Sequence, residues 1–127
     1  IDGQKISSQH LRGHVVMVNF WAPSCTTCVK EMPQLDRFAA DHAGRGWQVV
    51  GLAIDRREPV QKFLEKLPVR FPVVLGGVDG TDLGRQLGNA AGALPYTVVF
   101  RADGRAWRQK NGETSYEELS AWAAEVA

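Results

Sequence analysis

Two cysteines, Cys25 and Cys28, stand three positions apart in the stretch NFWAPSCTTCVKEMP and are the only cysteines in the chain. A pair at this spacing could form a structural disulfide, supply part of a metal site, or exchange disulfides with another molecule. A bridge that closes so short a loop constrains the unfolded chain little. A chain of 127 residues also buries enough surface to fold without a covalent link. Both considerations argue against a purely structural disulfide.

A metal site needs more ligands than this pair supplies. Structural zinc is held by four side chains in most proteins, and one Cys-x-x-Cys motif provides only half of them. The sequence has no second cysteine pair, and its histidines, His10, His14 and His42, form no cluster and are expected at the surface. The motif therefore favours a redox pair, and we expect no metal and no cofactor.

The two cysteines have different expected roles in such a redox pair. If a helix begins just after Cys25, its free N–H groups and partial positive charge favour the thiolate of that cysteine. Cys25 is then the nucleophile. Cys28 lies one turn into the helix, close enough to attack a mixed disulfide formed by Cys25 and to release the partner. The spacing predicts a pair that cycles between dithiol and disulfide.

The elements that position the pair alternate between strand and helix patterns. We expect a buried central strand at 15–22, a helix at 26–42 kinked at Pro33, a strand at 47–55, a helix at 58–67, a strand at 71–77, a brief helix within 79–88, a hairpin of strands 96–100 and 105–110, and a helix from Ser115, where Ser115 and Glu118 form a capping-box pattern. This order predicts an α/β fold whose mixed sheet is covered by helices on both faces. The cysteines lie where the first long strand passes into its helix, a usual place for a ligand site.

Charge and hydropathy limit the possible partners. The chain has 15 basic and 14 acidic residues, so no strong net field attracts nucleic acid or an anionic membrane. The longest apolar stretches, such as residues 15–22, are too short to span a bilayer. We expect one domain over residues 1–127, a monomer that recognises its partner by shape and chemistry. Because the chain begins at Ile1, we also expect that a leader or membrane anchor lies upstream.

Two longer motifs, GHVVMVNFWAPSCTTCVKEMP and LGNAAGALPYTVVFRADGR, together with the strand-helix-strand pattern between them, resemble the thioredoxin superfamily. More narrowly they resemble its TlpA, ResA and DsbE (CcmG) branch of exported, usually membrane-anchored thiol-disulfide oxidoreductases. The resemblance covers essentially the whole chain. It implies a thioredoxin-like fold with an N-terminal extension and a strand-helix insertion before a cis-proline.

The resemblance also assigns roles to single residues. Cys25 matches the attacking thiol and Cys28 the resolving thiol of the family. Pro95 matches the cis-proline opposite them, so the backbone of Leu94 would face the active site and could pair with an extended partner segment. Trp21 is expected to pack beside the cysteines, shield them and contribute to substrate binding; the alternative is a tryptophan that serves only the core.

Glu31 matches the acid that this branch carries one turn after the second cysteine. Other thioredoxins use an aspartate on the central strand, where this chain has Asn19. Because an amide cannot take a proton, the resemblance implies that Glu31 accepts the proton of Cys28, helped by burial that raises its pKa. The alternative is a solvated helix glutamate that pairs with Lys30 or Gln34.

The resemblance implies an extracytoplasmic, for example periplasmic, reductase of protein disulfides. Its partners would be apocytochrome c or a copper-site protein, in cytochrome c biogenesis or copper-site assembly, with electrons from a membrane thiol donor of the DsbD or CcdA kind. The chain departs from many relatives at Ser24, where they have tryptophan, and at Thr26 and Thr27, where they often have glutamate-proline or glycine-proline. Dithiol proteins of this architecture span about −270 to −120 mV, so the motif leaves the direction of electron flow open.

Two other functions compete for the same cysteines. A copper-binding, metallochaperone-like module would separate its cysteines by three residues and add a distant histidine ligand, and the sequence shows neither feature. A peroxiredoxin normally has threonine or serine three residues before its reactive cysteine, where this chain has Ala22. Protein disulfide exchange is therefore the preferred interpretation.

Overall fold

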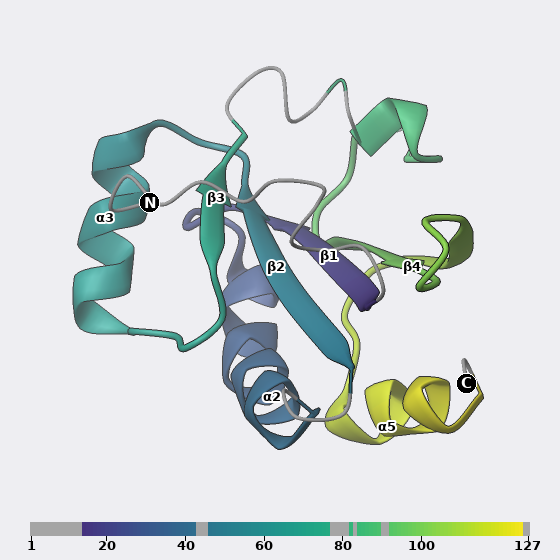
Figure 1. The fold of residues 1–127 in the computed structure, drawn as a ribbon. Helices are drawn as coiled ribbons and strands as arrows, with labels where there is room; N and C mark the ends of the chain where they lie inside the picture. The colour runs from purple at the N-terminus through teal and green to yellow at the C-terminus, as the bar shows by residue number, and fades with distance from the viewer. Residues whose placement is uncertain (1–13, 43–45, 77–81, 83, 90–91, 126–127) are drawn as a thin grey trace.

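The computed structural model describes residues 14–42, 46–76, 82, 84–89 and 92–125. Its elements are β1 (Val15–Trp21), α2 (Thr26–His42), β2 (Trp47–Ala53), α3 (Arg57–Lys66), β3 (Val73–Leu75), β4 (Tyr96–Phe100), β5 (Ala106–Asn111) and α5 (Tyr116–Glu125) (Figure 1). Each of these strands and helices was predicted from the sequence, within a few residues at its ends. The predicted N-terminal segment and part of the brief helix at 79–88 lie outside the described residues.

The described strands form one five-stranded sheet in the order β3-β2-β1-β4-β5. β1 lies in the middle, parallel to β2 and antiparallel to β4. A middle strand is covered on both faces and is therefore apolar on both. β1 has this composition, as predicted, and Met17, Phe20 and Trp21 are almost fully buried. Because β1 runs into α2, its position places the start of α2 at one end of the sheet centre (Figure 1).

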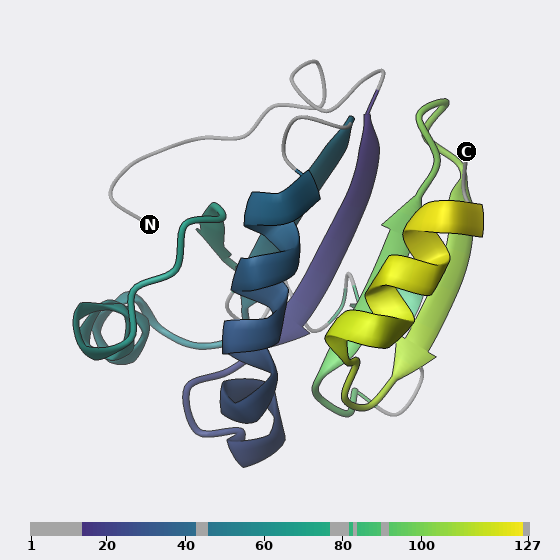
Figure 2. The ribbon, with the colours of Figure 1, turned by 90° about the horizontal axis from the view of Figure 1, so that it is seen from below.

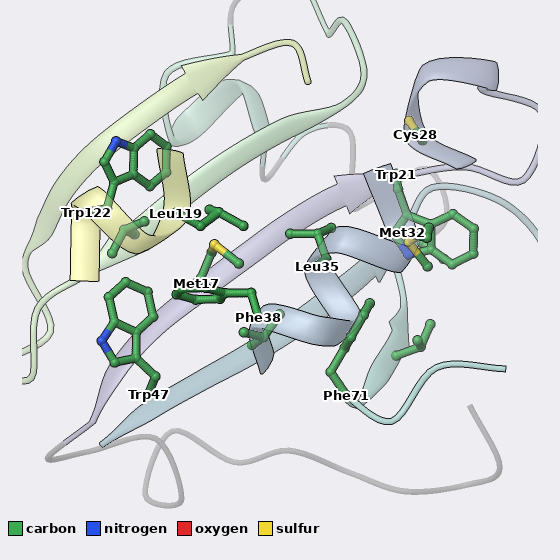
Figure 3. Packing of buried hydrophobic residues seen from close by; sticks show 14 of the residues in the cluster. Met17, Trp21, Cys28, Met32, Leu35, Phe38, Trp47, Phe71, Leu119 and Trp122 are labelled. Atoms are coloured by element: carbon green, nitrogen blue, oxygen red, sulfur yellow. The ribbon is translucent and has the colours of Figure 1, made fainter. Parts of the chain in front are cut away.

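Helices α2 and α5 lie side by side on one face of the sheet (Figure 2). Between them and the sheet, the main core packs Met17 of β1 against Phe38 of α2 and Leu119 of α5, all without exposed surface (Figure 3). On the other face, Phe20 and Tyr96 are covered in part by Leu87, which follows a helical turn at 84–86. The predicted mixed sheet flanked by helices is confirmed.

The final hairpin and helix show how local sequence sets the ends of elements. Gly104 adopts a φ of 90° in the turn between β4 and β5, a conformation that favours glycine. At the start of α5 the Ser115 hydroxyl accepts the Glu118 N–H at 3.1 Å, as a helix cap does. The Glu118 carboxylate instead binds Lys110 on β5. Only the serine half of the predicted capping box forms, because a basic side chain on the neighbouring strand binds the glutamate.

The prediction that His42 lies at the surface is wrong. His42 is 8% exposed, at the last position of α2. Its ring stacks on Phe38 with centroids 4.1 Å apart, and its Nδ1 lies 3.1 Å from the Phe38 carbonyl oxygen. Position 42 belongs to the same helical face as the buried residues Leu35 and Phe38, so the periodicity of the helix outweighs the usual preference of histidine for the surface.

Candidate active site

The cysteines lie at the junction of β1 and α2, as expected. They form a disulfide with Cα atoms 5.2 Å apart. Cys25 immediately precedes the first helical residue, and its carbonyl accepts the N–H of Val29 at 3.0 Å, the first bond of the helix. Its Sγ accepts the backbone N–H of Cys28 at 3.2 Å. The predicted start of the helix just after Cys25 is confirmed, and a free N–H of the first turn points at its sulfur.

The two cysteines differ in access to solvent. Cys25 is half-buried, and its neighbours Ser24, Thr26 and Thr27 are exposed. Cys28 has no exposed surface and belongs to the main core. A molecule that approaches from solvent therefore reaches Cys25 first, whereas Cys28 is reached through Cys25.

Leu94 and Pro95 lie at the same end of the sheet as the cysteines. The antiparallel pairing of β1 and β4 sets Phe20 opposite Tyr96. The next residue of β1, Trp21, therefore lies across from Pro95 at that end of the sheet. The Leu94-Pro95 peptide bond is cis, as the resemblance implied. Pro95 is buried, whereas Leu94 keeps some exposure and packs against the core cluster that contains Cys28.

Trp21 lies in the core below the cysteines. It has no exposed surface, and its ring packs against that of Phe63 of α3 with centroids 5.2 Å apart. Trp21 belongs to the same buried cluster as Met32 and Cys28 (Figure 3). Trp21 therefore packs as a core residue beneath the cysteines, without surface that a partner could contact in this conformation.

Glu31 lies fully inside the protein, one helical turn after Cys28. Its Oε1 accepts a hydrogen bond from Asn19 Nδ2 at 2.8 Å. Its Oε2 accepts two from Thr114, the backbone N–H at 2.6 Å and the hydroxyl at 2.7 Å. The solvated alternative is therefore excluded, and Gln34 instead accepts the N–H of Tyr116.

Burial raises the pKa of Glu31 above the ordinary glutamate value, because removal from water disfavours its charged form. The hydrogen bonds from Thr114 and Asn19 act in the opposite direction, since they favour the carboxylate. The negative charge of Glu113 raises the pKa further. The net direction is upward, toward the range in which a carboxyl group exchanges protons near neutral pH.

Comparison with known proteins identifies the family. A family model described as Redoxin matches residues 1–124. The chain belongs to the Redoxin family. It is 28% identical over 128 residues to the thiol-disulfide oxidoreductase ResA of a Bacillus cereus strain, and the match covers 99% of this chain and 71% of ResA.

Solved structures place this Redoxin chain in the same group. A thioredoxin-related protein from Neisseria meningitidis serogroup B is 30% identical, with a TM-score of 0.84 over 98% of this chain and 93% of that one. A secreted Mycobacterium tuberculosis disulfide oxidoreductase homologous to E. coli DsbE is 27% identical, with a TM-score of 0.76 over 98% and 90%. The chain is a TlpA, ResA and DsbE-like member of the thioredoxin superfamily and a protein disulfide oxidoreductase that acts on protein thiols.

Two residues around Glu31 were not predicted to belong to the site of this Redoxin protein. Thr114 lies in the connection between β5 and α5, and Thr97 accepts a second hydrogen bond from Asn19 Nδ2 at 3.2 Å. Both are fully buried. A hydroxyl side chain within the buried strand YTVVF was a weak indication that Thr97 has a polar partner. Nothing in the sequence near Thr114 indicates that it contacts Glu31. The fold alone brings it to Glu31.

Within residues 14–125, apart from the undescribed positions, no group of three or more His, Cys, Asp or Glu side chains is arranged to hold a metal. Among the same residues no helix has both the length and the apolar character needed to cross a bilayer.

The raised pKa of Glu31 predicts a pH dependence of stability. The folded protein binds the Glu31 proton more tightly than the unfolded chain, whose glutamate pKa is about 4.3. The resulting stabilisation is complete below that value and is lost as the pH rises through the higher pKa of the folded state. Urea unfolding of the oxidised protein over this range should show the Glu31→Gln variant gaining stability relative to wild type as the pH increases. A constant difference between the two proteins would contradict the assignment.

Proposed function

We propose that this protein is an extracytoplasmic reductase of protein disulfides, formed by residues 1–127 as one thioredoxin-like domain. The observation that carries the proposal is the difference between the two sulfurs. Cys25 is half-buried at the start of α2 and accepts an N–H bond, whereas Cys28 is fully buried one turn further on. The first environment suits an attacking thiolate and the second a resolving thiol.

The proposed reaction has two steps. In the reduced protein the Cys25 thiolate attacks a partner disulfide, forms a mixed disulfide and displaces one partner sulfur as a thiolate. Cys28 then gives its proton to Glu31 and attacks the Cys25 sulfur, so the Cys25–Cys28 bond forms and the second partner sulfur leaves with the electron pair. The cysteine pair is oxidised, and the partner disulfide becomes two thiols. Burial of Glu31 supports its role as proton acceptor.

We propose that the partner docks over Leu94 and Pro95. Leu94 retains exposed surface at the end of the sheet that carries the cysteines, and the backbone before a strand can pair with an extended segment. In this proposal Trp21 supports the cysteine loop from within the core. The rim formed by Ser24, Thr26 and Thr27 is polar, which suits a partner that contacts the site through its backbone.

The family supports partners such as apocytochrome c or a copper-site protein, with reduction by a membrane thiol donor of the DsbD or CcdA kind. The secreted M. tuberculosis relative supports an extracytoplasmic location, and membership of a usually anchored branch supports an N-terminal anchor. In this proposal the protein supplies the electrons that reduce disulfides in proteins that must receive haem or copper at reduced cysteines.

Measurement of the reduction potential tests the proposed direction. The oxidised and reduced forms would be equilibrated with dithiol and disulfide reference couples and separated after alkylation. A reductase should have a potential close to that of thioredoxin, about −270 mV, and should reduce a protein disulfide in repeated turnover. A potential of about −120 mV, as in strongly oxidising members of the superfamily, would contradict the reductase proposal and indicate an oxidase.

A further inference from the structure

Three hydrogen bonds converge on the Glu31 carboxylate from two residues that are far apart in the sequence. Asn19 on β1 donates to Oε1 at 2.8 Å. Thr114, before α5, donates to Oε2 through its N–H at 2.6 Å and its hydroxyl at 2.7 Å. Hydrogen bonds donated to a carboxylate stabilise its ionised form. Glu31 is thus held as a hydrogen-bond acceptor on both oxygens.

These donors take the place of water. Glu31, Asn19, Thr97 and Thr114 each have no exposed surface, so the carboxylate is shielded from bulk solvent. A buried carboxylate without donors would remain protonated and could not accept another proton. The donors are neutral and therefore offset part of the cost of burial without adding a counter-charge.

The titratable groups that face Glu31 are few. On α2, Cys28 lies one turn before it, with Cys25 at the start of the same helix. The connection to α5 contributes Glu113, whose negative charge favours the protonated form of Glu31. Asn19, which reaches it from β1, is neutral, and so is Thr97 on β4, which accepts a hydrogen bond from Asn19. The balance between ionised and protonated Glu31 therefore depends strongly on Asn19 and Thr114.

We propose that Asn19 and Thr114 are positioning residues for the resolving step, which keep Glu31 ionised and oriented so that it can accept the Cys28 proton. The inference rests on the proposed function, in which Glu31 is that acceptor. Neither residue touches the reacting sulfurs in this account, and both act through the carboxylate. Removal of one donor leaves the cysteines in place and makes the ionised form of Glu31 less favourable. A higher pH is then needed for the same rate of resolution.

The test uses the reduced protein and the aromatic disulfide dithiobis(nitrobenzoate), supplied in less than one equivalent. The attack of Cys25 releases one coloured thiolate, and the attack of Cys28 on the mixed disulfide releases the second. The first phase thus reports on Cys25 alone, whereas the pH profile of the second phase reports on proton transfer from Cys28. Stopped-flow absorbance resolves the two phases in each variant.

Thr114→Val removes the hydroxyl donor and preserves the shape of the side chain, and Asn19→Leu removes the amide donor. Both should shift the midpoint of the second phase to higher pH and leave the first phase unchanged. Below the wild-type midpoint the second phase should slow about tenfold, or about 1.4 kcal/mol, as expected for one hydrogen bond to a charged group. Thr114→Ser keeps the hydroxyl and should restore the wild-type profile.

The results distinguish the role of Glu31 as proton acceptor from the positioning role of Asn19 and Thr114. If Glu31→Gln loses the rise of the second phase that follows ionisation of Glu31, and Thr114→Val keeps the wild-type midpoint, Glu31 remains the acceptor and the positioning role is overturned. If Thr114→Ser shifts the midpoint as far as Thr114→Val does, the effect comes from packing and the positioning role is again overturned. If Glu31→Gln itself keeps the wild-type profile, the proton step of the proposed function fails, and the positioning role fails with it.

Discussion

Cys28→Ser should convert the protein into a covalent trap for its substrates. Cys25 keeps its place before the first helical residue and its partly exposed surface, so it still attacks a partner disulfide. Without the second sulfur no group one turn away can displace the partner. Turnover should fall to background while each protein molecule captures one partner in a mixed disulfide, which dithiothreitol releases. Non-reducing electrophoresis followed by mass spectrometry would detect and identify the captured protein.

Cys25→Ser is the matched control for this trap. The remaining sulfur of Cys28 is fully buried and lacks the position at the start of the helix. This variant should capture little partner under the same conditions. Alkylation of the reduced wild-type protein at about pH 6, well below the free thiol pKa of about 8.5, should likewise label Cys25 first. Equal capture by both variants, or earlier labelling of Cys28, would reverse the proposed roles.

Glu31→Gln should slow the release of a mixed disulfide by about a hundredfold near neutral pH. This is the lower end of the rate enhancement that a general base contributes. The variant should still fold. The carbonyl of the introduced glutamine can accept the Thr114 donors. Its amide can donate to Asn19 Oδ1, which has no hydrogen-bond partner in wild type, once the Asn19 amide rotates to turn that oxygen toward position 31. The capture step should be unchanged, because Glu31 lies beyond Cys28 and not beside Cys25.

The pH profile separates this effect from a general loss of activity. In wild type, release should accelerate as Glu31 loses its proton, at a pH above the ordinary glutamate value because burial raises its pKa. In Glu31→Gln that increase should vanish and leave only the rise that follows ionisation of the thiol, near a free pKa of about 8.5. Release rates identical to wild type from about pH 6 to 9 would remove Glu31 from the mechanism.

The sequence predicted those parts of the molecule that depend on local pattern. β1 and α2 follow from an apolar run and a three-and-four spacing, and the Cys-x-x-Cys motif lies at their junction. The family motif also indicated the burial of Glu31. The contacts that surround Glu31 could not be predicted in this way, because Thr114 is 83 positions from it and only the tertiary fold brings the two residues together.

The errors also have physical causes. His42 was expected at the surface from its residue type, yet its position on the buried face of α2 decides its environment. Glu118 was expected to complete a capping box, yet Lys110 on β5 binds its carboxylate. In both cases the position of the residue in the fold outweighed the usual preference of its residue type.

The hydrogen bonds between Thr114 and Glu31 join a late part of the chain to an early one. A ribosome delivers the chain from its N-terminus, so Cys25, Cys28 and α2 emerge before Thr114. Until that stretch arrives, Pro95 lacks the N–H that Gly112 donates to its carbonyl, and Glu31 lacks its two Oε2 donors. An incomplete chain thus carries both sulfurs before the donors of Glu31 are in place. In the proposed mechanism, rapid release of a partner therefore requires the stretch around Thr114 as well as the two sulfurs.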